Sequence, residues 1–155
     1  MSLINLSPIG TLVDNQKIII ISTPKSNSPD SIDLETIEFL KPPYIPFTKK
    51  FQNWIQEITQ QGYIPLDFRV PEYFKKDRKT IPADFDKEKI IIFPSIIYIK
   101  PYQPRKRKTY IMYHPRSLNR WLCDEIEIKF FFSENNNDKI LIAVIKNNLD
   151  KSNLQ

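Results

Sequence analysis

One segment of the chain, residues 48–61, has apolar positions that recur every three or four residues. This spacing places them on a single stripe of an α-helix. Thr48 can cap the first turn, and Gly62 can adopt the left-handed conformation that commonly follows the last turn. We therefore predict one well-defined helix that packs this stripe against a sheet. The stripe consists of Phe51, Trp54, Ile55 and Ile58.

The C-terminal third of the chain has a different period. In residues 125–132 every even-numbered position is Ile or Phe, and the odd-numbered positions begin with Glu, Glu and Lys. A period of two is typical of a β-strand with one buried face. Six turn-forming residues, 133–138, separate this segment from a second apolar run at residues 139–146. The pattern predicts a C-terminal β-hairpin.

Shorter apolar runs elsewhere predict further elements. Four of them favour strands, namely residues 11–13, 17–23, 63–70 and 89–100. Pro65 and Pro94 cannot donate a ladder hydrogen bond, so the two later strands are expected at a sheet edge or with a bulge. Short helical segments are also expected, at residues 32–40, from Pro71 onwards, and at residues 116–123.

Helical and extended segments are interspersed, and the best-supported strand pairs are hairpins, which favours an α+β fold with a mainly antiparallel sheet. A ferredoxin-like arrangement is one possibility, and residues 116–123 would have to supply its second helix. The chain has 155 residues, of which 41% are hydrophobic and 26% charged, as is usual for a single globular domain. We expect one domain over residues 1–147 and a flexible C-terminal tail at residues 148–155.

The composition argues against several classes of enzyme. The chain has two glycines, too few for the glycine-rich loops that hold phosphates in many nucleotide-dependent enzymes. Cys123 is the single cysteine and His114 the single histidine, so no disulfide and no zinc site built from such residues can assemble within the chain. We expect no cofactor, no metal and no enzymatic activity. Without a signal-like start or a long apolar run, a cytoplasmic protein is expected.

Some residues nevertheless offer catalytic hypotheses. His114, beside basic residues, can act as general acid or base in metal-free RNA cleavage, although a lone histidine is more often a structural hydrogen-bonding group. A pair of His114 with Cys123 is less favoured, because Cys123 is expected on a buried face. The sequence Glu127-Ile128-Lys129 resembles a short pattern of restriction-endonuclease-like nucleases. That resemblance implies a magnesium-binding carboxylate and a lysine that orients water, but a helix should then follow the strand.

Positive charge is concentrated in residues 100–121. This segment has seven Lys and Arg residues and no Asp or Glu, whereas the rest of the chain has 16 cations and 18 acids. The net charge of +5 therefore arises here, as expected of an electrostatic binding surface. Four of the six arginines lie between positions 105 and 120, and arginine suits phosphate recognition. The segment also has aromatic residues that can stack on unpaired bases, namely Tyr102, Tyr110, Tyr113 and Trp121.

We interpret this segment as a contact surface for the backbone of RNA or DNA, and the chain as a non-enzymatic basic subunit of a nucleoprotein assembly with further protein partners. Two other interpretations stay open, a solvated loop tip that protects a sheet edge and a face that binds an acidic protein. The alternative function is a structural or adaptor subunit of a multi-protein assembly. The candidate nucleic-acid-binding residues are Lys100, Arg105, Lys106, Arg107, Lys108, Tyr110, Tyr113, Arg116 and Arg120.

Overall fold

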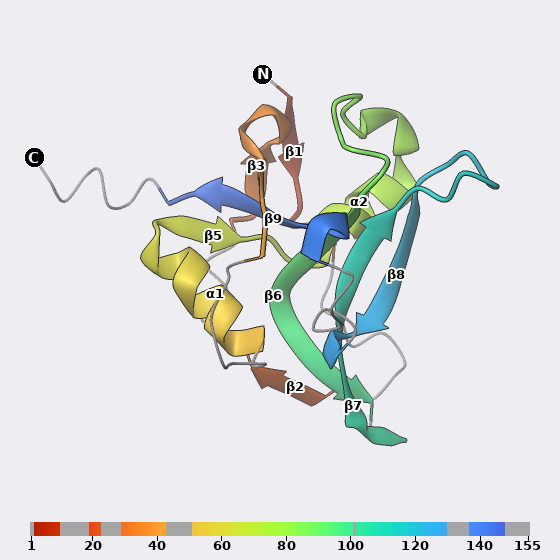
Figure 1. Ribbon diagram of the computed structural model, residues 1–155. Coiled ribbons are helices and arrows are strands. Elements are labelled where there is room, and N and C mark those ends of the chain that lie inside the picture. Colours follow the sequence, from red (N-terminus) through yellow and green to blue (C-terminus); the bar gives the residue numbers. More distant parts are fainter. Residues whose placement is uncertain are drawn as a thin grey trace, which may run out of the picture.

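A computed structural model describes residues 2–9, 19–22, 29–42, 51–100, 102–129 and 137–147. In these ranges the chain is mostly sheet, with the helices α1 (Phe51–Gln60) and α2 (Arg69–Lys76) and the short turns η1 (Leu34–Thr36), η2 (Arg78–Thr80) and η4 (Asn137–Lys139) (Figure 1). The strands are β1 (Leu3–Asn5), β2 (Ile19–Ser22), β3 (Ser31–Asp33), β4 (Glu38–Leu40), β5 (Tyr63–Pro65), β6 (Ile90–Lys100), β7 (Gln103–Tyr113), β8 (Leu122–Glu127) and β9 (Ile140–Lys146).

The main sheet has the strand order β4-β9-β6-β7-β8. Its ladders are antiparallel except between β6 and β9, where Ile90 lies opposite Ile140 in a parallel pair. β5 also pairs with β9, and β2 pairs with the distal half of β6. A separate two-stranded sheet joins β1 to β3. This arrangement agrees with the predicted α+β class and mainly antiparallel sheet.

β6 is bulged near its proline, which is one of the two outcomes that the sequence predicts; the other, a place at the sheet edge, does not apply to β6. Pro94 has no backbone N–H, and the register of β6 against β7 shifts between Phe93 and Tyr98. At this point the Ser95 amide donates to the Leu66 carbonyl at 3.2 Å, and the Leu66 amide donates to the Ala143 carbonyl at 3.0 Å. The chain after β5 therefore bridges β9 and β6 where β6 curves away.

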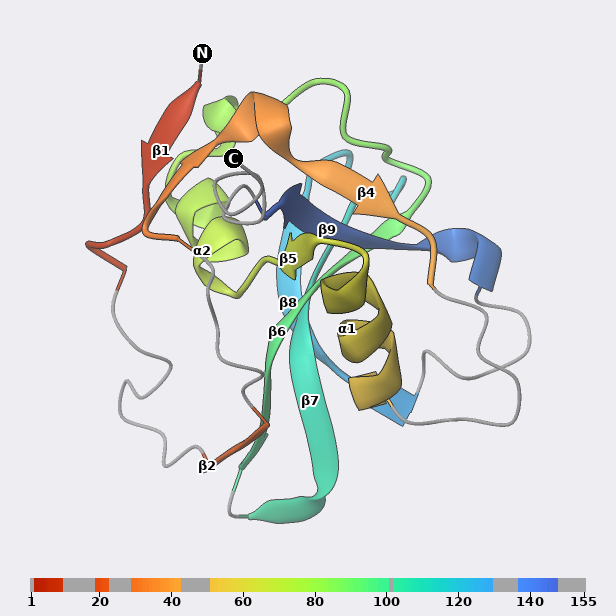
Figure 2. The same cartoon turned by 90° about the vertical axis from the view of Figure 1, so that its left-hand side faces the viewer.

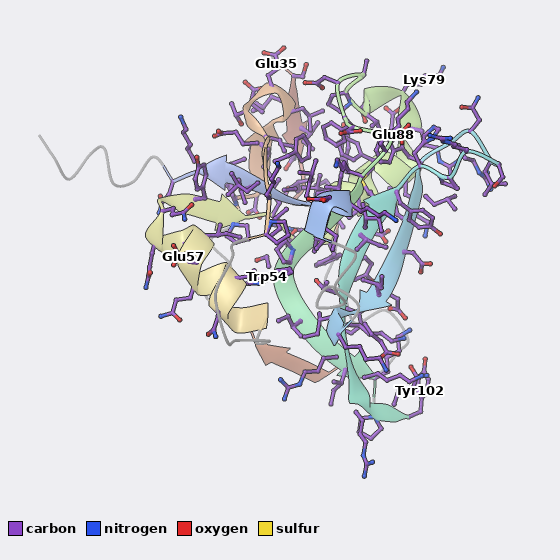
Figure 3. The ribbon with its side chains drawn as sticks, in the orientation of Figure 1. Glu35, Trp54, Glu57, Lys79, Glu88 and Tyr102 are labelled. Atoms are coloured by element: carbon purple, nitrogen blue, oxygen red, sulfur yellow. The ribbon has the colours of Figure 1, made fainter. Side chains whose placement is uncertain are left out.

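Helix α1 covers one face of the sheet. Trp54, Ile55 and Ile58 are buried in a cluster that also contains Ile92 of β6 and Val144 of β9. Figure 3 shows Trp54 on the side of α1 that faces β6. The prediction of a helix with this buried stripe is confirmed for these three residues.

The end of α1 also follows the prediction. Gly62 has a φ of +89°, in the left-handed region that glycine enters without steric cost. The proposed cap, Thr48, and the side chain of Phe51 lie outside the described residues. The expectation of a single well-defined helix is corrected by α2, an eight-residue helix that begins at Arg69 rather than at Pro71.

The opposite face of the sheet is covered by α2 and by the small β1–β3 sheet (Figure 2). Val70 and Phe74 of α2 pack in a core cluster with Phe93 and Met112 of the main sheet. Successive strand residues point to opposite faces. Because both faces of the central strands are buried, β6 and β9 have continuous apolar runs rather than alternating ones.

An ion-pair network attaches the start of β3 to α2. Nε of Arg69 donates to both carboxylate oxygens of the buried Asp67 at 3.1 Å, and Nη1 of Arg69 donates to Asp30 at 2.6 Å. Asp67 also accepts a hydrogen bond from the backbone N–H of Arg69, at 3.0 Å. This network fixes the direction in which the chain enters α2.

Three other predicted segments require correction. Residues 32–40 form β3, η1 and β4 instead of a helix. Asp33 caps the single 3-10 turn by accepting the Glu35 amide at 3.1 Å, and the turn ends because Ile37 is extended and residues 38–40 pair with β9. Residues 63–70 are extended only as far as Pro65. Residues 116–123 form turns that lead into β8, with Leu118 50% exposed, so they supply no second helix. Strands were also expected at residues 11–13 and 17–23. Of these residues the structure describes 19–22, which form β2.

The predicted C-terminal hairpin has a different pairing in the structure. Within the described residues β8 pairs with β7, and β9 pairs with β4, β5 and β6. Glu127 of β8 lies opposite Lys108 of β7, which favours this pair, since opposite charges across a ladder attract. The apolar β9 instead occupies the buried centre of the sheet. The tail expected at residues 148–155 lies outside the described residues.

Candidate nucleic-acid interface

The basic segment begins at the end of β6 and continues through β7 and the loop that follows it. Lys100 is the last residue of β6, Tyr102 lies in the turn, and β7 begins at Gln103. We call residues 102–107 the hairpin tip; in Figures 1 and 2 this end projects beyond the rest of the sheet. β7 has 11 residues, and a strand of that length spans about 35 Å. The tip and the loop after β7 therefore lie at opposite ends of the hairpin.

A polar network between β6, β7 and β8 lies directly behind the tip. Oε1 of Glu125 accepts hydrogen bonds from Nζ of Lys100 at 2.6 Å and from Nζ of Lys108 at 3.1 Å. Oε2 of Glu125 accepts from the hydroxyl of Tyr98, which is fully buried. The ring of Tyr98 lies 5.8 Å from that of Tyr110, the residue opposite Glu125 in the ladder. The network thus joins all three strands through one carboxylate.

Glu125 and Lys100 of this network are ionised at neutral pH. Burial acts to raise the pKa of Glu125, but hydrogen bonds from Lys100, Tyr98 and Lys108 outweigh it and hold this pKa below its ordinary value. The hydrogen bond to Glu125 raises the pKa of Lys100 by more than burial lowers it. Burial, followed by the hydrogen bond to Glu125, raises the pKa of Tyr98 and keeps its hydroxyl protonated. Lys100 and Lys108 therefore form ion pairs with an internal carboxylate. Their side chains are 11% and 15% exposed.

Glu127, the next carboxylate on the same face of β8, forms longer ion pairs than Glu125 does. Glu127 lies 3.7 Å from Nζ of Lys106 and 3.3 Å from Nζ of Lys129. The side chain of Lys106 is 48% exposed, and exposed pairs of this kind contribute little to stability. Lys106 is therefore available to an external anion at small cost.

Two arginines of the tip are open to a ligand. Arg105 and Arg107 are exposed and have no ion-pair partner among the described residues. They lie where the register of β7 against β6 shifts, between the pair of Lys100 with Gln103 and the pair of Tyr98 with Lys108. Tyr102, labelled in Figure 3, lies in the turn that precedes β7 and is 70% exposed.

The remaining basic candidates lie at the other end of β7. Arg116 and Arg120 are exposed residues of the loop that follows the strand. Nη2 of Arg116 lies 3.2 Å from Oε1 of Glu88, and Figure 3 shows Glu88 and Tyr102 at opposite ends of the molecule. The structure therefore does not bring all the sequence candidates onto one surface.

The aromatic candidates are distributed between core and surface. Tyr110 is half-buried against Phe68, with ring centroids 5.7 Å apart, and Tyr113 is half-buried against the α1 cluster. Trp121 is buried, and its ring lies 5.4 Å from that of His114. Tyr102 is thus the aromatic residue of the segment whose ring is most open to a ligand.

Cys123 and Lys129, which belong to the catalytic hypotheses, both form contacts within the fold. Sγ of Cys123 donates to the Pro71 carbonyl at 3.3 Å, and burial, with a further contribution from Glu72, raises the pKa of this thiol to about 11. No group of three or more His, Cys, Asp or Glu side chains within the described ranges is placed to hold a metal ion. Lys129 contacts Glu127 as an ion pair.

Analysis of the sequence missed Glu125 and Tyr98 as partners of the basic segment. One signal was present, since Lys106, Lys108 and Tyr110 alternate along β7 with the same period as Glu125 and Glu127 along β8. Comparison with protein-family models, with curated proteins and with solved structures gives no match for this chain. Among the described helices, none has the length and apolar character needed to cross a membrane.

Proposed function

We propose that this chain is a non-enzymatic basic subunit of a nucleoprotein assembly and contacts the backbone of RNA or DNA through the hairpin tip. The observation that carries the proposal is the division of charge along the hairpin. Lys100 and Lys108 are held by Glu125, whereas Arg105 and Arg107 are exposed without an ion-pair partner among the described residues. Phosphate is the anion that paired arginine forks suit best.

The proposal narrows the contact surface to one end of β7. Arg105, Lys106 and Arg107 supply the phosphate contacts, while Lys100, Lys108 and Tyr110 stabilise the hairpin from within. Arg116 and Arg120 are not part of this surface, and Tyr113 packs in the core. Binding of this kind depends strongly on salt, because phosphate contacts release condensed counterions.

Neutralising the tip tests the proposal. Fluorescence anisotropy with a labelled RNA or DNA oligonucleotide gives the affinity over a series of salt concentrations for the wild type and for Arg105→Gln/Arg107→Gln. Loss of two phosphate contacts should weaken binding at low salt and reduce the slope of log affinity against log salt by about 1.4 to 1.8. Thermal unfolding should be unchanged, since exposed charges contribute little to stability.

The matched control is Arg116→Gln/Arg120→Gln, which removes the same charge at the opposite end of β7. It should leave both the affinity and the slope close to those of the wild type. If the two double variants lose affinity equally, attraction is due to net charge and not to the tip. If neither changes binding, the structural or adaptor subunit becomes the better proposal.

A further inference from the structure

The tip carries one strongly exposed aromatic side chain. Among the large hydrophobic residues in the described ranges, the exposed ones are Leu3, Tyr102 and Leu118, and Tyr102 is the most exposed at 70%. It lies in the turn between β6 and β7, in the same tip as the exposed Arg105 and Arg107. An exposed ring beside cations is the arrangement with which proteins hold unpaired bases.

The polar network behind the tip holds the base of the turn that contains Tyr102. Lys100 lies opposite Gln103 in the ladder and closes this turn, and its ammonium is held by Glu125 at 2.6 Å. Lys100 is nearly buried, with 11% of its side chain exposed, so the base of the turn is well supported. A tyrosine has only two side-chain torsions, so an exposed ring on such a turn loses little conformational freedom when a base stacks on it.

We propose that Tyr102 is a base-stacking residue and that the preferred ligand of the tip is single-stranded RNA or DNA with unpaired bases. This inference rests on the proposed function. Arg105 and Arg107, which follow in β7, then hold phosphates of the same strand. Paired bases present only their edges and phosphates, so a duplex gains from the cations but not from the ring.

The test compares substitutions at position 102 on a single strand that carries 2-aminopurine and on its duplex. Tyr102→Ala should weaken single-strand binding about 5- to 150-fold and leave the slope of log affinity against log salt unchanged. Duplex binding should stay the same. Fluorescence of 2-aminopurine, which falls when the base stacks, should be quenched by the wild type and not by this variant.

Three control variants separate stacking from other effects. Tyr102→Phe keeps the ring and should retain quenching, whereas Tyr102→Leu keeps apolar surface without a ring and should lose it. Leu118→Ala removes an exposed apolar side chain at the other end of β7 and should have no effect on binding. Unfolding curves should be the same for all of them, because the substituted side chains are exposed.

Two results would overturn the inference. If Tyr102→Ala binds the single strand as tightly as the wild type while Arg105→Gln/Arg107→Gln binds it more weakly, the tip binds phosphate without stacking. If Tyr102→Ala weakens single strand and duplex equally, the ring does not select unpaired bases. A failure of the proposed function itself looks different, because the double arginine variant would then bind both ligands as the wild type does.

Discussion

Replacing Glu125 by Gln should destabilise the protein, because one carboxylate holds two nearly buried ammonium groups. The substitution removes two charged hydrogen bonds, to Lys100 and Lys108, and weakens a third from Tyr98. Hydrogen bonds to charged groups each contribute about 1.5–3 kcal/mol, but the Glu125 side chain is 23% exposed and solvent compensates part of the loss. We expect a decrease of about 2–4 kcal/mol in the free energy of unfolding.

Urea denaturation at neutral pH measures this decrease, with Asp124→Asn as the matched control. Asp124 is an exposed neighbour that accepts the Glu125 amide, and its amide variant should change stability by less than about 0.5 kcal/mol. Adding Lys100→Met to Glu125→Gln should recover part of the loss, since the unpaired buried ammonium is then removed as well. A loss below about 0.5 kcal/mol for Glu125→Gln would refute the reasoning.

The pH dependence of the same pair of proteins adds a second check. The pKa of Glu125 is lower in the folded state than its ordinary value, so its stabilising contribution is present above the ordinary pKa and is lost as pH falls through the folded pKa. The difference in stability between the wild type and Glu125→Gln should therefore shrink on acidification. A constant difference down to strongly acidic pH would show that the carboxylate is not held by the lysines.

Three further outcomes follow from the structure. Trp54→Ala should cost about 3–5 kcal/mol as a core truncation, and a cost under about 1 kcal/mol in urea unfolding would contradict the burial of the α1 stripe. Alkylation of Cys123 should be slow in the native state, because a rise in pKa from 9.0 to about 11 reduces the thiolate at neutral pH about 100-fold. Labelled RNA and DNA should stay intact with magnesium or manganese, and cleavage that disappears in Glu127→Gln or His114→Ala would reveal an active site.

Local periodicity predicted the elements in which one pattern dominates. The stripe of Trp54, Ile55 and Ile58 could only face a core in a helix, and Pro94 required either an edge position or a bulge in an otherwise apolar strand. Residues 32–40 offered no dominant period. The outcome there depended on the long-range pairing of β4 with β9, which a local pattern does not contain.

Strand pairing was harder to predict than strand location. The six turn-forming residues at 133–138 suggested that the segments on either side pair with each other, whereas β8 and β9 lie on different sides of β6 and β7. The same long-range pairing brings Glu125 to Lys100 and Lys108, so the division of the basic segment into internal and exposed cations follows from the tertiary fold. Composition alone showed where the positive charge lies in the sequence, but not which carboxylates pair with it.

Mapping the contact surface by nuclear magnetic resonance tests the central claim most directly. Backbone amide shifts of the isotope-labelled protein are followed as a single-stranded oligonucleotide is added at low salt. The account predicts that shift changes centre on residues 102–107, with Tyr102, Arg105 and Arg107 among the largest, and that they reverse when salt is raised. Shift changes centred on residues 116–120, or no change in the tip at saturating oligonucleotide, would contradict it.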